Sequence, residues 1–196
     1  MLVSENRKFL FIHIQKTGGT SLTRHFFEHI PDIAHVCRPH SPITEFQGDT
    51  KEYFTAAFVR NPYDRLVSWF TAIDRKRGVN RHINFMQRQV LERVDNFRDF
   101  ILHCHDIQGA SGWLPFTNNQ LDYISIDGEV AVDFIGRFES FDSSVSTLAK
   151  KIDIPDSVPH INSSSHRHYR EYYDDETRAI VAKRFARDLE YFGYEF

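Results

Sequence analysis

The sequence is poor in cysteine, has no long apolar run and carries no large excess of charge of either sign. Its two cysteines, Cys37 and Cys104, match neither a zinc-ligand nor a redox spacing, so we expect free thiols. No apolar stretch approaches the roughly 20 residues that a membrane-spanning helix needs. The formal net charge of −3 argues against bulk electrostatic coating of nucleic acid, so no nucleic-acid partner is expected.

No secretory signal is expected, because residues 1–8 are polar and show no charged segment followed by an apolar one. We therefore expect a cytoplasmic protein. Phenylalanine and histidine are abundant, with 18 and 11 copies among 196 residues. The phenylalanines indicate a heavily packed interior. The length lets about 70% of the surface of the unfolded chain be buried, which suits one domain over residues 1–196.

Two segments have the pattern of a strand, a turn and a helix. Residues 8–15 (KFLFIHIQ) form a nearly continuous apolar run, typical of a strand buried on both faces of a parallel sheet. A glycine turn and an amphipathic helix follow. Residues 53–60 (YFTAAFVR) repeat the strand pattern, and Asn61 and Pro62 then supply an N-cap and a first-turn proline for a helix. Such βαβ units predict an α/β fold with a mainly parallel sheet flanked by helices.

The rest of the chain is expected to contribute shorter elements and loops. Further strands are predicted at 121–126 and 132–138, and further helices at 97–105, 140–152 and 174–191. Residues 31–51 and 111–119 contain several prolines and glycines and are expected to be loops. No repeat or linker divides the sequence.

The first predicted turn has the composition of an anion-binding loop. A glycine turn that opens a helix directs backbone N–H groups and the positive end of the helix dipole at one point. Lys16 adds a full positive charge there. Hydroxyl donors and glycines follow it: Thr17, Gly18, Gly19, Thr20 and Ser21. A tight turn without any ligand is the alternative interpretation of the glycine pair.

The order of these residues differs from that of a Walker A loop, where lysine follows the second glycine and the next Ser or Thr holds Mg²⁺. Here Lys16 precedes Gly18 and Gly19, and no glycine lies four or five residues upstream. A magnesium-dependent nucleotide triphosphatase is therefore disfavoured. A phosphate or sulfate ester bound without metal is expected instead.

Arg60 and Ser68 indicate a second anion-binding point. Arg60 ends its predicted strand, so its guanidinium should reach the same carboxyl edge of the sheet as Lys16. Ser68 falls on the second turn of the following helix and could donate to an anion held by Arg60. Alternatively, Arg60 pairs with Asp64 and Ser68 is simply helix surface.

His13 is the candidate base, because it lies three residues before Lys16 on the face of the strand that carries Phe9 and Phe11. An imidazole with its ordinary pKa of about 6.5 suits general-base catalysis near neutral pH. A hydrogen-bonded core histidine is the alternative. The other histidines show no firm zinc spacing, and no metal is expected.

Two of these segments together resemble the sulfotransferases that use 3′-phosphoadenosine-5′-phosphosulfate (PAPS). Residues 11–21 (FIHIQKTGGTS) are similar to the 5′-phosphosulfate loop, and residues 58–70 (FVRNPYDRLVSWF) to the 3′-phosphate strand and helix. The wording HIQKTGGT is closest to the heparan sulfate 6-O-sulfotransferase branch. Three later segments resemble bacterial members of the carbohydrate type: IGRFESF at 135–141, PHIN at 159–162 and FGYEF at 192–196.

The resemblance implies a P-loop-like three-layer fold and a role for each matching residue. Lys16 would contact the transferred sulfuryl group and the leaving 5′-phosphate, and His13 would take the proton of the acceptor hydroxyl. Arg60 and Ser68 would hold the 3′-phosphate. The loop that wraps the 5′-phosphate would consist of Thr17, Gly18, Gly19, Thr20 and Ser21. The product is 3′-phosphoadenosine-5′-phosphate (PAP), and residues 163–166 (SSSH) would close over the nucleotide.

An acceptor hydroxyl on a carbohydrate is the expected partner. A predicted turn is basic and contains Arg75, Lys76, Arg77 and Arg81. This turn would suit an anionic polysaccharide, or would simply be a charged turn in solvent. Trp113 and Phe116 could stack on a sugar or fill the core, and Arg167 or Arg170 could also serve the acceptor. Two other functions stay open, a P-loop-like nucleotide or small-molecule kinase and a non-catalytic PAP-binding protein.

Overall fold

The computed structural model describes residues 1–79, 82–109, 112–158 and 167–196. These residues form two compact units. The first contains residues 1–60 and the described part of 120–163, and the second contains the described residues of 61–119 and of the chain from 164 to 196. A single domain over the whole chain stays a prediction.

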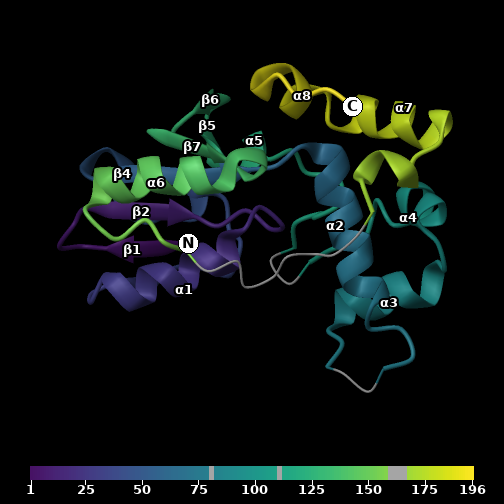
Figure 1. Cartoon of the computed structure of the whole chain (residues 1–196), viewed down its shortest axis with the longest axis horizontal. Coiled ribbons are helices and arrows are strands. Elements are labelled where there is room, and N and C mark those ends of the chain that lie inside the picture. Colours follow the sequence, from purple (N-terminus) through teal and green to yellow (C-terminus); the bar gives the residue numbers. More distant parts are fainter. Residues whose placement is uncertain (80–81, 110–111, 159–166) are drawn as a thin grey trace. The chain divides into compact units, whose positions relative to one another are not determined.

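The first unit is built on a five-stranded sheet in the order β3-β1-β2-β4-β7 (Figure 1). Strand β4 pairs in parallel with β2 and β7, whereas β1 pairs antiparallel with β2 and β3. The strands are β1 (Leu2–Ser4), β2 (Phe9–Ile12), β3 (Ala34–His35), β4 (Phe54–Val59) and β7 (Phe134–Arg137). The prediction of an α/β protein with a central, mainly parallel sheet is confirmed.

Continuous apolar runs let both faces of this sheet be buried. Phe9 and Phe11 of β2 and Phe58 of β4 point to one face, where they pack with α1 (Gly19–His29) and α6 (Phe141–Ile152). Leu10 and Val59 alternate with them and are also fully buried. Helices α1 and α6 therefore cover one face of the sheet, and the phenylalanines of this unit form core, as expected.

The N-terminal strand β1 was missed, because the polar run Glu5–Arg7 dominates the first eight residues. Those polar residues form a turn, while Leu2 and Val3 before it are buried. Leu2 pairs with Phe11 and Ser4 with Phe9. Ser4 Oγ donates to the Asp32 carboxylate at 2.8 Å, which satisfies the one hydroxyl of the strand. Three residues are too few for an alternation pattern to be read.

The predicted strand at 121–126 is wrong in its first part. The chain forms a short helix, α5 (Leu121–Ile124), and then a two-stranded hairpin of β5 (Ser125–Ile126) and β6 (Glu129–Val130). Leu121, Tyr123 and Ile124 are all buried. A short apolar run of this kind cannot be assigned by periodicity alone. The strand at 132–138 is confirmed as β7.

The second unit is helical and is packed around phenylalanine. Its core contains Phe70, Phe97, Phe100 and Phe116. Asn61 caps α2 as predicted, its side chain accepting a hydrogen bond from Tyr63 N–H at 3.0 Å. The helices are α2 (Pro62–Asp74), α3 (Phe85–Arg93), α4 (Phe97–His103), α7 (Asp175–Arg184) and α8 (Ala186–Phe192) (Figure 1). Of these, α3 was not predicted.

The predicted helix at 174–191 is divided into α7 and α8 by an inserted side chain. The Asn119 amide donates to Arg184 O at 3.3 Å and accepts from Asp188 N–H at 3.2 Å. In an unbroken helix those two backbone groups would bond to each other, because they lie four residues apart. The insertion of Asn119 therefore explains the break at Phe185.

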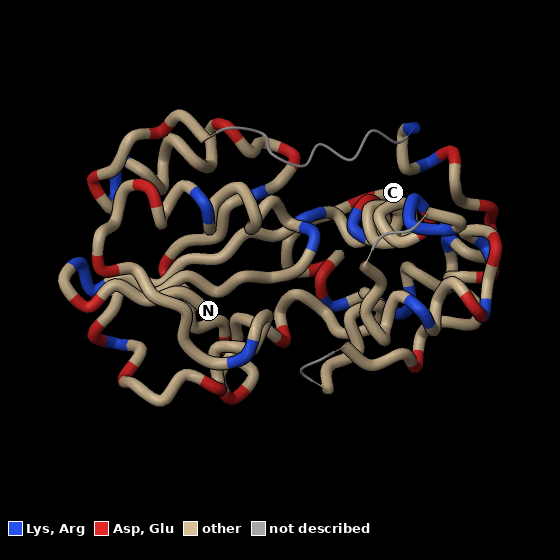
Figure 2. Tube along the Cα trace, turned by 90° about the horizontal axis from the view of Figure 1, so that it is seen from below, with Lys and Arg blue, Asp and Glu red and all other residues tan. Residues whose placement is uncertain are grey.

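Both cysteines are free, as expected, with Cys37 exposed and Cys104 buried. Burial raises the pKa of the Cys104 thiol to about 11, so it stays protonated at neutral pH. Within the described ranges, no helix has the length and apolarity required to span a bilayer. Acidic and basic residues are interspersed along both units (Figure 2).

Candidate anion-binding and catalytic site

The loop between β2 and α1 is shaped by its own side chains. The strand ends at Ile12 and not at Gln15, so the predicted strand was three residues too long. Thr17 is fully buried, and its hydroxyl donates to Ile14 O at 2.9 Å, which closes the turn. Lys16 and Gly18 both adopt left-handed backbone conformations, with φ of 69° and 86°. For a lysine this conformation costs on the order of 1 kcal/mol or more.

The start of α1 presents backbone N–H groups without a capping side chain. Gly18 is the N-cap residue, and its carbonyl accepts from Ser21 N–H at 3.1 Å. The first N–H groups of a helix have no partner within the helix and carry the positive end of its dipole. The first turn of α1, which the structure describes in full, contains no acidic residue. The helix end is thus suited to an anion.

Both glycines of the loop are in close contact with aromatic rings. A Cβ on Gly18 would lie 2.5 Å from Phe141 Cε2, and a Cβ on Gly19 would lie 2.1 Å from His13 Cδ2. Real Cβ atoms do not approach other atoms so closely. Tight packing therefore requires a glycine at each position, independently of any ligand.

Arg60 joins the loop from the end of β4. Its Nη1 donates to Lys16 O at 3.2 Å, and its guanidinium carbon lies 4.0 Å from the centre of the Phe138 ring. Only 4% of the residue is exposed. Its backbone is held by the Gln120 amide, which accepts from Arg60 N–H and donates to Arg60 O, each at 2.8 Å. The structure therefore brings Arg60 and Lys16 together at the carboxyl edge of the sheet.

The imidazole of His13 lies between Gly19 and the ring of His40. The centres of the two imidazoles are 4.5 Å apart and the rings are nearly perpendicular. Burial, with a smaller contribution from His40, lowers the pKa of His13 from its ordinary 6.5 to about 3. The residue is therefore neutral at physiological pH, and the expectation of an unperturbed pKa was wrong.

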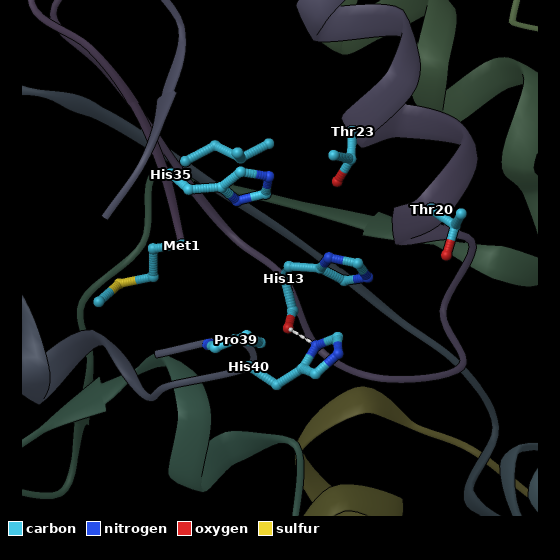
Figure 3. A pocket seen from close by; sticks show the side chains of 8 residues that line it. Met1, His13, Thr20, Thr23, His35, Pro39 and His40 are labelled. Carbon is cyan, nitrogen blue, oxygen red and sulfur yellow. Dashed lines mark hydrogen bonds between the residues drawn. The ribbon is translucent and has the colours of Figure 1, made fainter. Parts of the chain in front are cut away.

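His13 also lines a pocket of about 220 Å³ (Figure 3). The other lining residues are Met1, Leu2, Thr20, Thr23, His35, Pro39 and His40. His40 Nδ1 donates to His13 O at 3.0 Å and holds one wall in place. Thr23 Oγ1 is buried and has no hydrogen-bond partner among the described residues. His40 was missed because it lies in an irregular segment 27 residues from His13, and its spacing gives no signal.

The other residues predicted to bind the cofactor are Ser68, two short segments and the start of α1. Ser68 is buried on α2 in the second unit, and its pairing with Arg60 stays a prediction. Residues 159–162 and 163–166, proposed from the resemblance, lie outside the described residues. The loop residues Thr20 and Ser21 are the second and third residues of α1, with Thr20 exposed and Ser21 buried.

Several acceptor candidates serve the fold of the second unit. Arg77 donates to the carbonyls of Leu91 and Val94 and pairs with Asp74 and Asp95. Phe116 is a core residue, as the alternative interpretation had it. The other contacts are Lys76 Nζ with Gln87 and His82 O, Arg170 with Phe196 O, and Arg167 with Glu171. Arg81 lies outside the described residues.

A parallel strand, a glycine loop, a helix N-terminus and the contact of Arg60 with that loop form, in an α/β protein, an arrangement suited to an oxyanion. The chain matches the model of the Sulfotransferase family over residues 1–195 and therefore belongs to that family. A search of curated proteins found no match. Family membership identifies the chain as a transferase of sulfuryl groups.

Proposed function

We propose that the protein transfers the sulfuryl group of PAPS to an acceptor hydroxyl on a carbohydrate, with the loop of Lys16–Ser21 as the site of transfer. The observation that carries this proposal is the position of the His13 imidazole, packed on Gly19 at the head of the anion-binding helix. The proposed base and the proposed oxyanion site would thereby lie side by side in one unit. Both are needed when a hydroxyl attacks an anionic ester.

The donor groups of the loop suit a phosphosulfate. The ammonium group of Lys16, the helix N–H groups and the hydroxyls of Thr20 and Ser21 would hold the 5′-phosphosulfate. When bound, PAPS supplies an activated sulfuryl group on a phosphate leaving group. The chain would contribute charge stabilisation, because Lys16 and the N–H groups would lie where negative charge develops on the leaving oxygen. Arg60 supports this by holding the carbonyl of Lys16.

His13 would accept the proton of the acceptor hydroxyl. Its lowered pKa keeps the imidazole neutral, so a nitrogen lone pair is present at all physiological pH values. An anion in the adjacent loop favours the protonated imidazole and raises this pKa toward neutrality. The pocket beside His13, with the unpaired hydroxyl of Thr23 among the described groups, is where we place the acceptor.

Arg60 and Ser68 would bind the 3′-phosphate of PAPS. The fold would be of the P-loop-like, three-layer kind. The protein would be cytoplasmic. Replacement of Arg60 by Gln should then lower the affinity for PAP toward that for AMP, which lacks the 3′-phosphate. Ser68→Ala should have a smaller effect in the same direction. Ser143→Ala, an exposed serine of α6, is the control. Equal losses for PAP and AMP would contradict the assignment.

Thermal unfolding with ligands tests the donor, and labelled PAPS tests the transfer. PAP should stabilise the protein without Mg²⁺, far more than ADP does. A strict magnesium requirement, or equal stabilisation by ADP, would instead favour a kinase. Label from PAPS should then appear on members of a glycan panel, and Lys16→Ala and His13→Ala should abolish it. PAP binding without transfer to any glycan, phenol or peptide would indicate a non-catalytic binder.

A further inference from the structure

We propose that His25, Glu28 and His29 on α1 form a binding site for a divalent transition-metal ion, best suited to Zn²⁺. Their candidate ligand atoms all lie within 4.8 Å of one another, and the two imidazole centres are 4.5 Å apart. Two histidines four residues apart on a helix share a face and can bind one zinc ion. This site is separate from the proposed transfer site, and the spacing of the histidines had not led us to expect a metal.

The hydrogen bond of His25 sets its ring for ligation. His25 is almost wholly buried, and its Nε2 lies 2.6 Å from the carbonyl oxygen of Pro155. A carbonyl oxygen can only accept, so Nε2 carries the proton and donates it. Metal-binding histidines generally donate their second N–H to a carbonyl or carboxylate in this way, which fixes the tautomer and the ring orientation.

The other nitrogen of His25 is left without a partner. Among the described residues, Nδ1 is a buried polar atom that makes no hydrogen bond. A buried polar group without a partner is unfavourable and needs an explanation. In the neutral tautomer that donates from Nε2 to Pro155 O, Nδ1 carries a lone pair. A metal ion on Nδ1 would satisfy that lone pair.

The remaining ligands can close around an ion without a change in the fold. Zinc binds nitrogen at about 2.0–2.1 Å, so ligand atoms on one ion lie roughly 3.4 Å apart. His29 is half-buried and Glu28 is exposed, which leaves their side chains free to rotate inward. Glu28 Oε1 is 2.9 Å from Arg24 Nε, and its second oxygen is available for the ion. Two imidazoles and one carboxylate leave a fourth position for water.

Titration of the metal-free full chain with ZnCl₂, followed by calorimetry, tests this site. We expect one equivalent of tight binding, weakened at least tenfold in His29→Ala and in Glu28→Gln. His25→Ala should also lose the site, but its buried position threatens folding, so the other two variants carry the test. The control is the double variant His35→Ala/His40→Ala, which removes two other histidines of the same unit and should bind zinc normally.

Cobalt provides a second readout. Co²⁺ should give the visible absorption of a low-coordinate nitrogen–oxygen site in the wild type and in the control, and lose it in His29→Ala. Zinc should also raise the unfolding temperature of the wild type but not of His29→Ala. Unchanged zinc affinity in His29→Ala or Glu28→Gln, or loss of binding in the control, would overturn the proposal.

Discussion

The imidazole of His13 lies against the Cα of Gly19, so that a Cβ added to Gly19 would be 2.1 Å from His13 Cδ2 and 2.2 Å from Nε2. The first residue of α1 and the proposed base are therefore fitted to each other. The glycine does more than permit a turn, because it leaves the space that the ring occupies. This contact fixes the distance between the proposed base and the anion-binding helix end.

Gly19→Ala should destabilise the protein by about 1–3 kcal/mol, the usual cost of overpacking. The added methyl must displace the His13 ring or the helix start. His13→Ala in the same chain removes the clash, so the double variant should recover most of the lost free energy of unfolding. Urea unfolding measures both. Gly109→Ala is the control, since its Cβ would meet no atom closer than 3.5 Å. Additive effects of the two substitutions would contradict the fitted contact.

The stability of the protein should fall in acid through His13. Its pKa in the fold is about 3, below the ordinary 6.5, so the unfolded chain binds the proton more tightly. The stabilising effect is complete above pH 6.5 and is lost as the pH falls from there toward 3. Between these two pKa values the unfolded chain binds up to one proton more than the folded chain, so the slope rises to at most about 1.4 kcal/mol per pH unit.

Urea unfolding of the wild type and of His13→Asn at several pH values between neutrality and about pH 5 measures this slope. Asparagine does not titrate, so the two curves should converge as the pH falls. The other histidines contribute equally to both proteins. Parallel curves would show that the His13 pKa is not lowered.

Lys16→Gly should separate the charge of Lys16 from its backbone conformation. Glycine adopts the left-handed conformation of this position without strain and keeps the carbonyl that Arg60 binds. The free energy of unfolding should therefore change by less than about 1 kcal/mol. Binding of PAP should weaken at least tenfold, because a charge-assisted contact is removed. Lys8→Gly is a matched control, since Lys8 also has positive φ, 47°, and lies outside the loop. Unaltered PAP binding in Lys16→Gly would contradict the role of the ammonium group.

Arg77→Ala should affect folding more than catalysis. It would leave the carbonyls of Leu91 and Val94 without their donor, at a cost of about 1–3 kcal/mol. The exposed Arg75 is the comparison, and Arg75→Ala should change the free energy of unfolding by less than about 0.5 kcal/mol. Thermal unfolding distinguishes the two variants. Equal stability of both, with reduced transfer in Arg77→Ala, would restore Arg77 as an acceptor contact.

The sequence was sufficient for the elements that bury long apolar runs or carry clear caps. The strands β2 and β4 and the capped helix α2 follow from apolar continuity and from Asn61 and Pro62. It was insufficient where a tertiary contact decides the outcome. The break between α7 and α8 depends on an amide from Asn119, some 65 residues away from Arg184. No local sequence pattern predicts this break.

The candidate site divides in the same way. The sequence alone was enough to select Lys16, the glycines and Arg60 as candidates, because strand ends and helix starts meet at one edge of a parallel sheet. The lowered pKa of His13 and its contact with His40 could not be predicted from the sequence, because both depend on residues that are distant from His13 in the chain. The two histidines of α1 are visible in the sequence as residues four apart. Only the hydrogen bond of His25 to Pro155 O, which the sequence does not reveal, indicates a ring oriented for metal binding.

Gln120 has a consequence for how this position can vary among related chains. Its side chain gives Arg60 one donor and one acceptor, as a neighbouring strand would, and so extends the sheet by a single amide beyond β4. A carboxylate offers only acceptors and an aliphatic chain offers neither. Because both bonds go to the backbone of residue 60, which any residue except proline would supply, drift at position 120 should be confined to side-chain amides whichever side chain occupies position 60.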